Sequence, residues 1–168
     1  MKKTYFKNIS ILAINPCARG MGFAVLEGHD KLLDWGVKSG KGDKNTVAIA
    51  NAKKLINCKK PEVIVLQDMA NAKRHPRIKR LNTKIAALAK ANKIEVALVS
   101  DEQLKMNLFA TAKGNRHKIA ETVANRFPDE LGFSLPPKRK LWKTEDSRIE
   151  FFYAVALALA LKVKKSSL

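Results

Sequence analysis

The chain has 168 residues, and its 33 Lys and Arg against 15 Asp and Glu give a formal net charge of +18. This length predicts a single domain over residues 1–168. No run reaches the ~18 apolar residues of a membrane span, and two cysteines make neither a disulfide framework nor a metal-site spacing. The charge favours nucleic acid over a membrane surface as the partner, and the few cysteines favour a reducing, cytoplasmic setting.

The chain opens on β-rich segments. Apolar runs at 9–14 and 21–26 flank a Gly- and Pro-containing turn, which predicts a hairpin, and 31–37 predicts a third antiparallel strand. Asn15 ends the first strand, where α/β sheets commonly present their chemistry, and Arg19 lies in the following turn.

Helices and strands alternate downstream. The predicted elements are a helix to about 58, a strand at 62–66, a helix to about 92, a strand at 94–99, and helices at 101–110, at 116–127 and from about 144 to 163. Together with the meander they predict an α/β fold with a five-stranded mixed sheet, an antiparallel three-strand meander plus two parallel strands, flanked by helices. Right-handed crossovers place the first strand beside the strand at 62–66.

Local signals mark the helix ends. Asn45 and Thr144 are predicted N-caps, and Ser100 forms a capping box with Gln103. Residues 128–143 are expected to be irregular. Trp142 within this segment could stack on an unpaired base, but core packing is the preferred interpretation.

Several segments together resemble the RuvC-like nucleases of the ribonuclease H-like superfamily, and more narrowly a set of uncharacterised bacterial RuvC-like proteins. The matching segments are ILAINPCARGMGFAVLEG, LLDWGV, PEVIVLQD, RHPRIKRL, RHKIAETVANRFP and LPPKRKLWKTEDSRIEFFYAVALALA. They extend over nearly the whole chain. The resemblance implies a ribonuclease H-like fold related to Holliday junction resolvases.

The resemblance also implies three metal-binding acids, and this chain departs from all three. Asn15 stands where the family has Asp, Gln67 where it has Glu, and Tyr153 where it has Asp. In that family the acids hold two divalent ions for phosphodiester hydrolysis, a chemistry that needs anionic oxygen ligands. We therefore predict a degenerate catalytic site with no bound metal and no cofactor.

Acids remain near these positions. Asp68 follows the strand at 62–66 and is expected to point to its opposite face. Asp146 and Glu150 are expected to be one helical turn apart, on one face. A rebuilt site around them, using Mg²⁺ or Mn²⁺, is the alternative, although charge capping of a helix is preferred for Glu145 and Asp146.

Basic residues gather in three irregular segments and in the first turn. We predict that they bind nucleic acid mainly through phosphates, with DNA favoured over RNA. The predicted binding residues are Arg19, Lys73, Arg74, Arg77, Lys79, Arg80, Lys113, Asn115, Arg116, Lys118, Lys138, Arg139, Lys140 and Lys143.

Three functions follow from these observations. The first is a RuvC-like protein that binds structured or branched nucleic acid without cutting it. The second is an atypical metal-dependent endonuclease, resembling a junction resolvase, with a rebuilt acidic site. The third is a regulatory pseudonuclease that uses the fold for protein contacts. The sequence leaves a homodimer or a larger assembly open.

Overall fold

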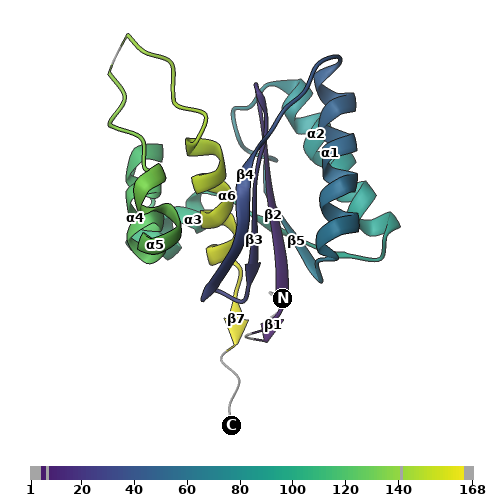
Figure 1. Ribbon diagram of the computed structural model, residues 1–168, viewed down its shortest axis with the longest axis horizontal. Coiled ribbons are helices and arrows are strands. Elements are labelled where there is room, and N and C mark those ends of the chain that lie inside the picture. The colour runs from purple at the N-terminus through teal and green to yellow at the C-terminus, as the bar shows by residue number, and fades with distance from the viewer. Residues whose placement is uncertain (1–4, 7, 141, 165–168) are drawn as a thin grey trace.

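A twisted five-stranded sheet forms the centre of the molecule (Figure 1). The computed structural model describes residues 5–6, 8–140 and 142–164. The strands of this sheet are β2 (Ser10–Cys17), β3 (Gly20–Glu27), β4 (Lys31–Lys38), β5 (Val63–Gln67) and β6 (Glu95–Val99). Their order is β4-β3-β2-β5-β6, with β4, β3 and β2 antiparallel and β2, β5 and β6 parallel. The predicted mixed sheet and the position of its first strand are therefore confirmed.

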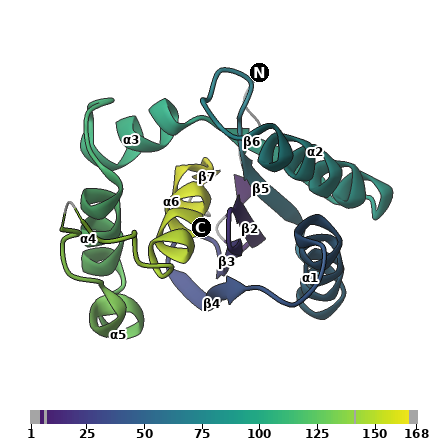
Figure 2. The same ribbon diagram turned by 90° about the horizontal axis from the view of Figure 1, so that it is seen from above.

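Helices cover both faces of the sheet. They are α1 (Lys44–Lys59), α2 (Pro76–Ala91), α3 (Asp101–Phe109), α4 (Arg116–Arg126), α5 (Pro128–Leu131) with the 3-10 turn η1 (Gly132–Ser134), and α6 (Ile149–Ala160). Figure 2 shows α1 and α2 on one face, and α6 with α3, α4 and α5 on the other. A short parallel pair, β1 (Tyr5–Phe6) with β7 (Val163–Lys164), lies beyond the sheet.

The side chains of β2 explain this layering, because successive residues point to opposite faces. Ile11 and Ala13 pack with α4 and α6, whereas Leu12 and Ile14 pack with α1 and α2. The apolar α6 is buried at Ile149 and from Phe151 to Leu159, as its composition predicts. None of the helices that the structure describes is long and apolar enough to span a membrane.

Two predicted N-caps are wrong. Asp43 rather than Asn45 caps α1, through a hydrogen bond from Thr46 N. Thr144 caps nothing, since α6 begins at Ile149. The reason is local: Asp146 Oδ1 accepts the Arg148 N–H at 2.9 Å, and such a side-chain turn competes with helix formation.

The segment before α6 differs from the prediction in two other ways. Residues 128–134 are helical rather than irregular, with Pro128 at the first helical position, where proline is favoured. Trp142 is 79% exposed, so the expectation that it packs in the core is wrong. At the other end, α6 ends at Ala160, and residues 163–164 form β7 instead of extending the helix. The capping box of Ser100 and Gln103 is confirmed.

Candidate functional site

Asn15 and Gln67 lie at the carboxyl ends of adjacent parallel strands. The pairing of β2 with β5 sets Ala13 beside Val65, and the same offset sets Asn15 level with Gln67. Both side chains belong to the face that α6 covers, because Ala13 and Val65 pack there two residues earlier. Asn15 is fully buried and Gln67 is 4% exposed. The structure therefore brings these two predicted positions together beneath α6.

A glycine opposite Asn15 lets α6 approach the sheet closely. Gly22 on β3 pairs with Asn15, and a Cβ built on Gly22 would lie 2.4 Å from the Glu150 carbonyl oxygen. A side chain at position 22 would therefore displace the first turn of α6. This contact fixes where Glu150 enters the site.

Glu150 is the carboxylate that meets Asn15. The Asn15 amide Nδ2 donates to Glu150 Oε2 at 2.7 Å and approaches the Glu150 carbonyl at 3.3 Å. Arg116 Nη2 donates to the same Oε2 at 2.9 Å. One carboxylate oxygen therefore accepts from an amide and from a guanidinium, and the bond from the guanidinium is charge-assisted.

Arg116 links two carboxylates to an aromatic ring. Its Nη1 lies 3.1 Å from Glu145 Oε1, and its Cζ lies 5.4 Å from the centre of the Tyr153 ring. Burial lowers the pKa of the Arg116 guanidinium, but Glu150 and Glu145 outweigh burial and leave this pKa above its ordinary value. Arg116 is therefore a fixed cation within the site.

The Tyr153 ring lies under that guanidinium. Its hydroxyl donates to Asp101 Oδ1 at 2.7 Å, and Lys105 Nζ lies 2.7 Å from Asp101 Oδ2. Burial, followed by the hydrogen bond to Asp101 and the charge of that carboxylate, raises the pKa of the Tyr153 phenol well above its ordinary value. Tyr153 is therefore a neutral hydrogen-bond donor at physiological pH.

A second guanidinium reaches Gln67. Arg74 Nη1 donates to Gln67 Oε1 at 3.1 Å, and Arg74 Nη2 donates to the Pro16 carbonyl at 2.8 Å. Asn82 on α2 donates to the Gln67 carbonyl at 2.9 Å. The amide of Gln67 is thus held as an acceptor for arginine at the end of β5.

The other predicted acids are used elsewhere. Asp68 Oδ1 accepts from Ala70 N at 3.1 Å, in the turn after β5. Asp146 binds the Arg148 guanidinium at 2.8 Å, and that hydrogen bond is the main cause of its lowered pKa. Asp146 lies before α6, so it does not share a helical face with Glu150 as predicted.

These donors do not suit a pair of divalent cations. Mg²⁺ sites need carboxylates whose charge is available, whereas Glu150 is compensated by Arg116, and Asn15 and Gln67 contribute neutral amides. Within 5–6, 8–140 and 142–164, no three His, Cys, Asp or Glu side chains form a group that could hold a metal ion.

The predicted nucleic-acid-binding residues divide into two sets. Arg74, Arg77 and Arg116 are partly buried, and Arg77 donates to Asn45 Oδ1 at 2.9 Å. Lys79 is also partly buried. Asn115 caps α4 by accepting from Lys118 N at 2.8 Å, while Lys118 Nζ lies 4.9 Å from the centre of the Phe109 ring. The exposed cations are Arg19, Lys73, Arg80, Lys113, Lys118, Lys138, Arg139, Lys140 and Lys143.

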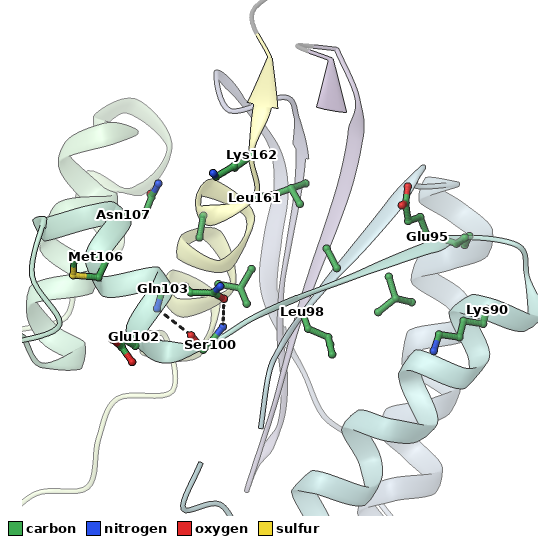
Figure 3. A pocket seen from close by; sticks show the side chains of 15 residues that line it. Lys90, Glu95, Leu98, Ser100, Glu102, Gln103, Met106, Asn107, Leu161 and Lys162 are labelled. Carbon is green, nitrogen blue, oxygen red and sulfur yellow. Dashed lines mark hydrogen bonds between the residues drawn. The ribbon is translucent and has the colours of Figure 1, made fainter. Parts of the chain in front are cut away.

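A groove lies away from this site, along the sheet edge at β6. Figure 3 shows Leu98 of β6 between Lys90 at the end of α2 and Met106 of α3. Leu98 is 53% exposed and Met106 is 49% exposed. None of the predicted site residues lines this groove. The homodimer or larger assembly that the sequence leaves open stays a prediction.

Two contact residues of the site, Glu145 and Asp101, are not among the residues that the sequence predicts for it. The sequence favours helix capping for Glu145, and Asp101 stands only at the start of a predicted helix. Arg74 is a predicted binding residue, but its contact with Gln67 does not follow from the sequence. One available signal was Gly22, because glycine within a strand often marks a close approach of another backbone.

No protein-family model matches the chain, and no curated protein matches it in sequence. Its structure is similar to Thermus thermophilus RuvC, with a TM-score of 0.63 at 16% identity over 90% of this chain and 92% of that one. The fold is RuvC-like. T. thermophilus RuvC in complex with a Holliday junction substrate gives a TM-score of 0.65 at 16% identity, over 90% and 92% of the two chains. The yeast mitochondrial Holliday junction resolvase Ydc2 gives 0.65 at 13% identity, over 95% of this chain and 79% of that one.

The RuvC-like fold confirms the predicted ribonuclease H-like architecture. In this chain the sheet order sets β2 beside β5, and the first turn of α6 packs against the sheet at Gly22, where the site lies. Identities of 13–16% establish the fold and leave the chemistry to be argued from this chain's own residues.

Proposed function

We propose that this protein binds structured or branched nucleic acid, DNA in preference to RNA, and does not cleave it by a metal-dependent reaction. One observation carries the second half of this proposal. Glu150, the carboxylate at Asn15, is bound to Arg116 at 2.9 Å, so a guanidinium occupies the position of its counter-ion. A divalent ion would have to displace this fixed cation.

Charge and position support nucleic acid as the ligand. The net charge of +18 attracts a polyanion, and phosphate contacts dominate such binding. Two basic segments each place one arginine in the site, since Arg74 contacts Gln67 and Arg116 contacts Glu150. The similar RuvC structure with a Holliday junction substrate favours branched DNA as the first ligand to test.

The test combines binding with cleavage. A labelled four-way junction, a duplex and single strands of DNA and RNA are titrated with protein, with and without Mg²⁺ or Mn²⁺, and resolved for both shifted and cut species. We expect binding that weakens steeply with salt, strongest for the DNA junction, and no metal-dependent products.

A pair of double variants tests the surface. Lys73→Ala with Arg80→Ala removes two exposed cations from the basic segment that contains Arg74, whereas Lys53→Ala with Lys54→Ala removes two exposed cations from α1. Both pairs lower the net charge by the same amount, so a difference between them reports the positions of the cations. Only the first pair should flatten the salt dependence of binding, by about two phosphate contacts. Equal effects of the two pairs would contradict the assigned surface.

Other results would select another function. Metal-dependent cleavage that is abolished by Glu150→Gln would establish the rebuilt endonuclease. Absence of binding to every nucleic acid at low salt would contradict the proposal and leave protein contacts as the use of the fold.

A further inference from the structure

The loop between η1 and α6 is anchored at both ends. At its start, His117 Nε2 lies 3.1 Å from the Pro136 carbonyl. At its end, Glu145 accepts from Arg19 through its carbonyl at 3.0 Å and pairs with Arg116 through its carboxylate at 3.1 Å. Figure 1 shows this loop projecting from the end of the molecule where α6 begins. The loop is thus tied at its base to the candidate site.

The part between these anchors, residues 137–144, is strongly basic. It contains four cations and no acidic residue. All four cations are exposed: Lys138, Arg139, Lys140 and Lys143. A run of like charges without compensation is unfavourable by itself and becomes favourable against phosphates. We refer to residues 137–144 as the basic loop.

Trp142 is a large apolar side chain that is exposed among these cations. It is 79% exposed, although tryptophan is usually highly buried in folded proteins. Lys140 Nζ lies 5.6 Å from the centre of its ring, which places a cation over one face. The Lys143 N–H donates to the Lys140 carbonyl at 3.0 Å, so Trp142 belongs to a closed turn.

We propose that the Trp142 ring stacks on an unpaired base of the nucleic acid while the cations of the basic loop bind the adjoining phosphates. This inference rests on the proposed nucleic-acid binding and specifies which part of the ligand the loop contacts. An aromatic ring among cations is the combination that binds single-stranded segments. The base must be unpaired, because the faces of paired bases are covered by their neighbours in the helix.

The exposed Phe133 provides a matched control. It is 97% exposed and precedes the same loop, but the charged residues closest to it in the sequence are the acidic Asp129 and Glu130 rather than cations. An acidic surface repels phosphates, so Phe133 should not contact nucleic acid. Removing either aromatic ring from the surface leaves the packed core unchanged.

The experiment uses three labelled DNA duplexes of one sequence: fully paired, with a central bulge of unpaired bases, and with the same bulge made of abasic sites. The abasic bulge keeps the phosphates and lacks the bases. We expect the wild-type chain to bind the base-containing bulge roughly 5- to 150-fold more tightly than the abasic one. Trp142→Ala should bind both bulges equally, Trp142→Phe should keep most of the preference, and Phe133→Ala should keep all of it.

Fluorescence gives a second readout. Trp35 and Trp142 are the two tryptophans of the sequence, so a Trp35→Phe background reports Trp142 alone. Stacking should quench this signal with the base-containing bulge and not with the abasic one. If Trp142→Ala still binds DNA and prefers the base-containing bulge over the abasic one as strongly as the wild-type chain does, the stacking role is wrong and the proposed function is unaffected. Absence of binding to all three duplexes overturns both.

Discussion

Asn15 Nδ2 lies 2.7 Å from Oε2 of Glu150, a residue 135 positions later in the chain. The amide is a donor and the carboxylate an acceptor, so the two side chains are complementary as they stand. An acid at position 15 would instead oppose the charge of Glu150. The neutral residue at the end of β2 therefore fits a site in which Arg116 already balances the Glu150 carboxylate.

Replacing Glu150 tests that balance. Glu150→Gln keeps a side chain of similar size but removes the charge that Arg116 contacts. We expect the free energy of unfolding to fall by about 1–2 kcal/mol, between the values for exposed and buried ion pairs. Nucleic-acid affinity should rise, because Arg116 becomes available to phosphates. Urea denaturation and salt-dependent titration measure the two effects.

Glu121→Gln is the matched control for this change. The Glu121 side chain is 52% exposed and pairs with His117. Its replacement should alter stability by no more than about 0.5 kcal/mol. A decrease in nucleic-acid affinity on Glu150→Gln would show that Arg116 is not released toward a ligand.

The close approach at Gly22 gives a second prediction. Gly22→Ala places a Cβ 2.4 Å from the Glu150 carbonyl oxygen, so α6 must shift away from β3. Overpacking of this kind costs about 1–3 kcal/mol, and more where backbone must move. Chemical denaturation should show this loss. Gly132→Ala, where a Cβ meets nothing within 4 Å, should leave stability nearly unchanged. Equal stability of the two variants would contradict the packing.

The sequence predicts the sheet well because its strands are short apolar runs. The order of β2 and β5 and the face of Asn15 follow from chain direction and from the alternation of side chains. This is enough to bring Asn15 and Gln67 together. It does not reveal which charged groups approach them from other elements.

The positions of those charged partners depend on whether a segment forms a helix or a side-chain-stabilised turn, and hydrophobic periodicity does not distinguish the two. Residues 144–148 have a good helical start signal, but the contact of Asp146 with Arg148 forms a turn instead. Glu145 consequently lies where Arg116 can reach it. Trp142 was misassigned for a related reason, since a tryptophan between lysines has the same sequence pattern whether it is packed or exposed.

The ionisation of Tyr153 predicts how stability depends on alkaline pH. The folded-state pKa of Tyr153 is raised, by burial first, above the value of about 10 for an unfolded chain. The stabilisation is therefore fully present below about pH 10 and is lost as pH rises toward the folded-state pKa. The free energy of unfolding should decline above pH 10.

A single-tyrosine variant makes this measurable. Tyr5 is the other tyrosine, so Tyr5→Phe leaves the phenolate absorbance to Tyr153 alone. We expect this absorbance to appear only together with unfolding, as followed by circular dichroism. Reversible ionisation near pH 10 in the folded protein would contradict the buried hydrogen bond to Asp101.

Placing acids at positions 15, 67 and 153 should create a site for a divalent cation. Glu145 and Glu150 both pair with Arg116, and Arg74 brings a second guanidinium to Gln67, so two acids stand against two arginines in the natural chain. Asn15→Asp with Gln67→Glu adds two negative charges, and Tyr153→Asp a third, which favours a divalent cation. Calorimetric titration with Mn²⁺ should show no binding to the natural chain and binding to the triple variant. The double variant keeps the buried Tyr153 and should also bind Mn²⁺, so it tests the prediction even if the triple variant does not fold.

Tight Mn²⁺ binding by the natural chain would show that a metal displaces Arg116 from Glu150. The proposed absence of metal-dependent cleavage would then be wrong.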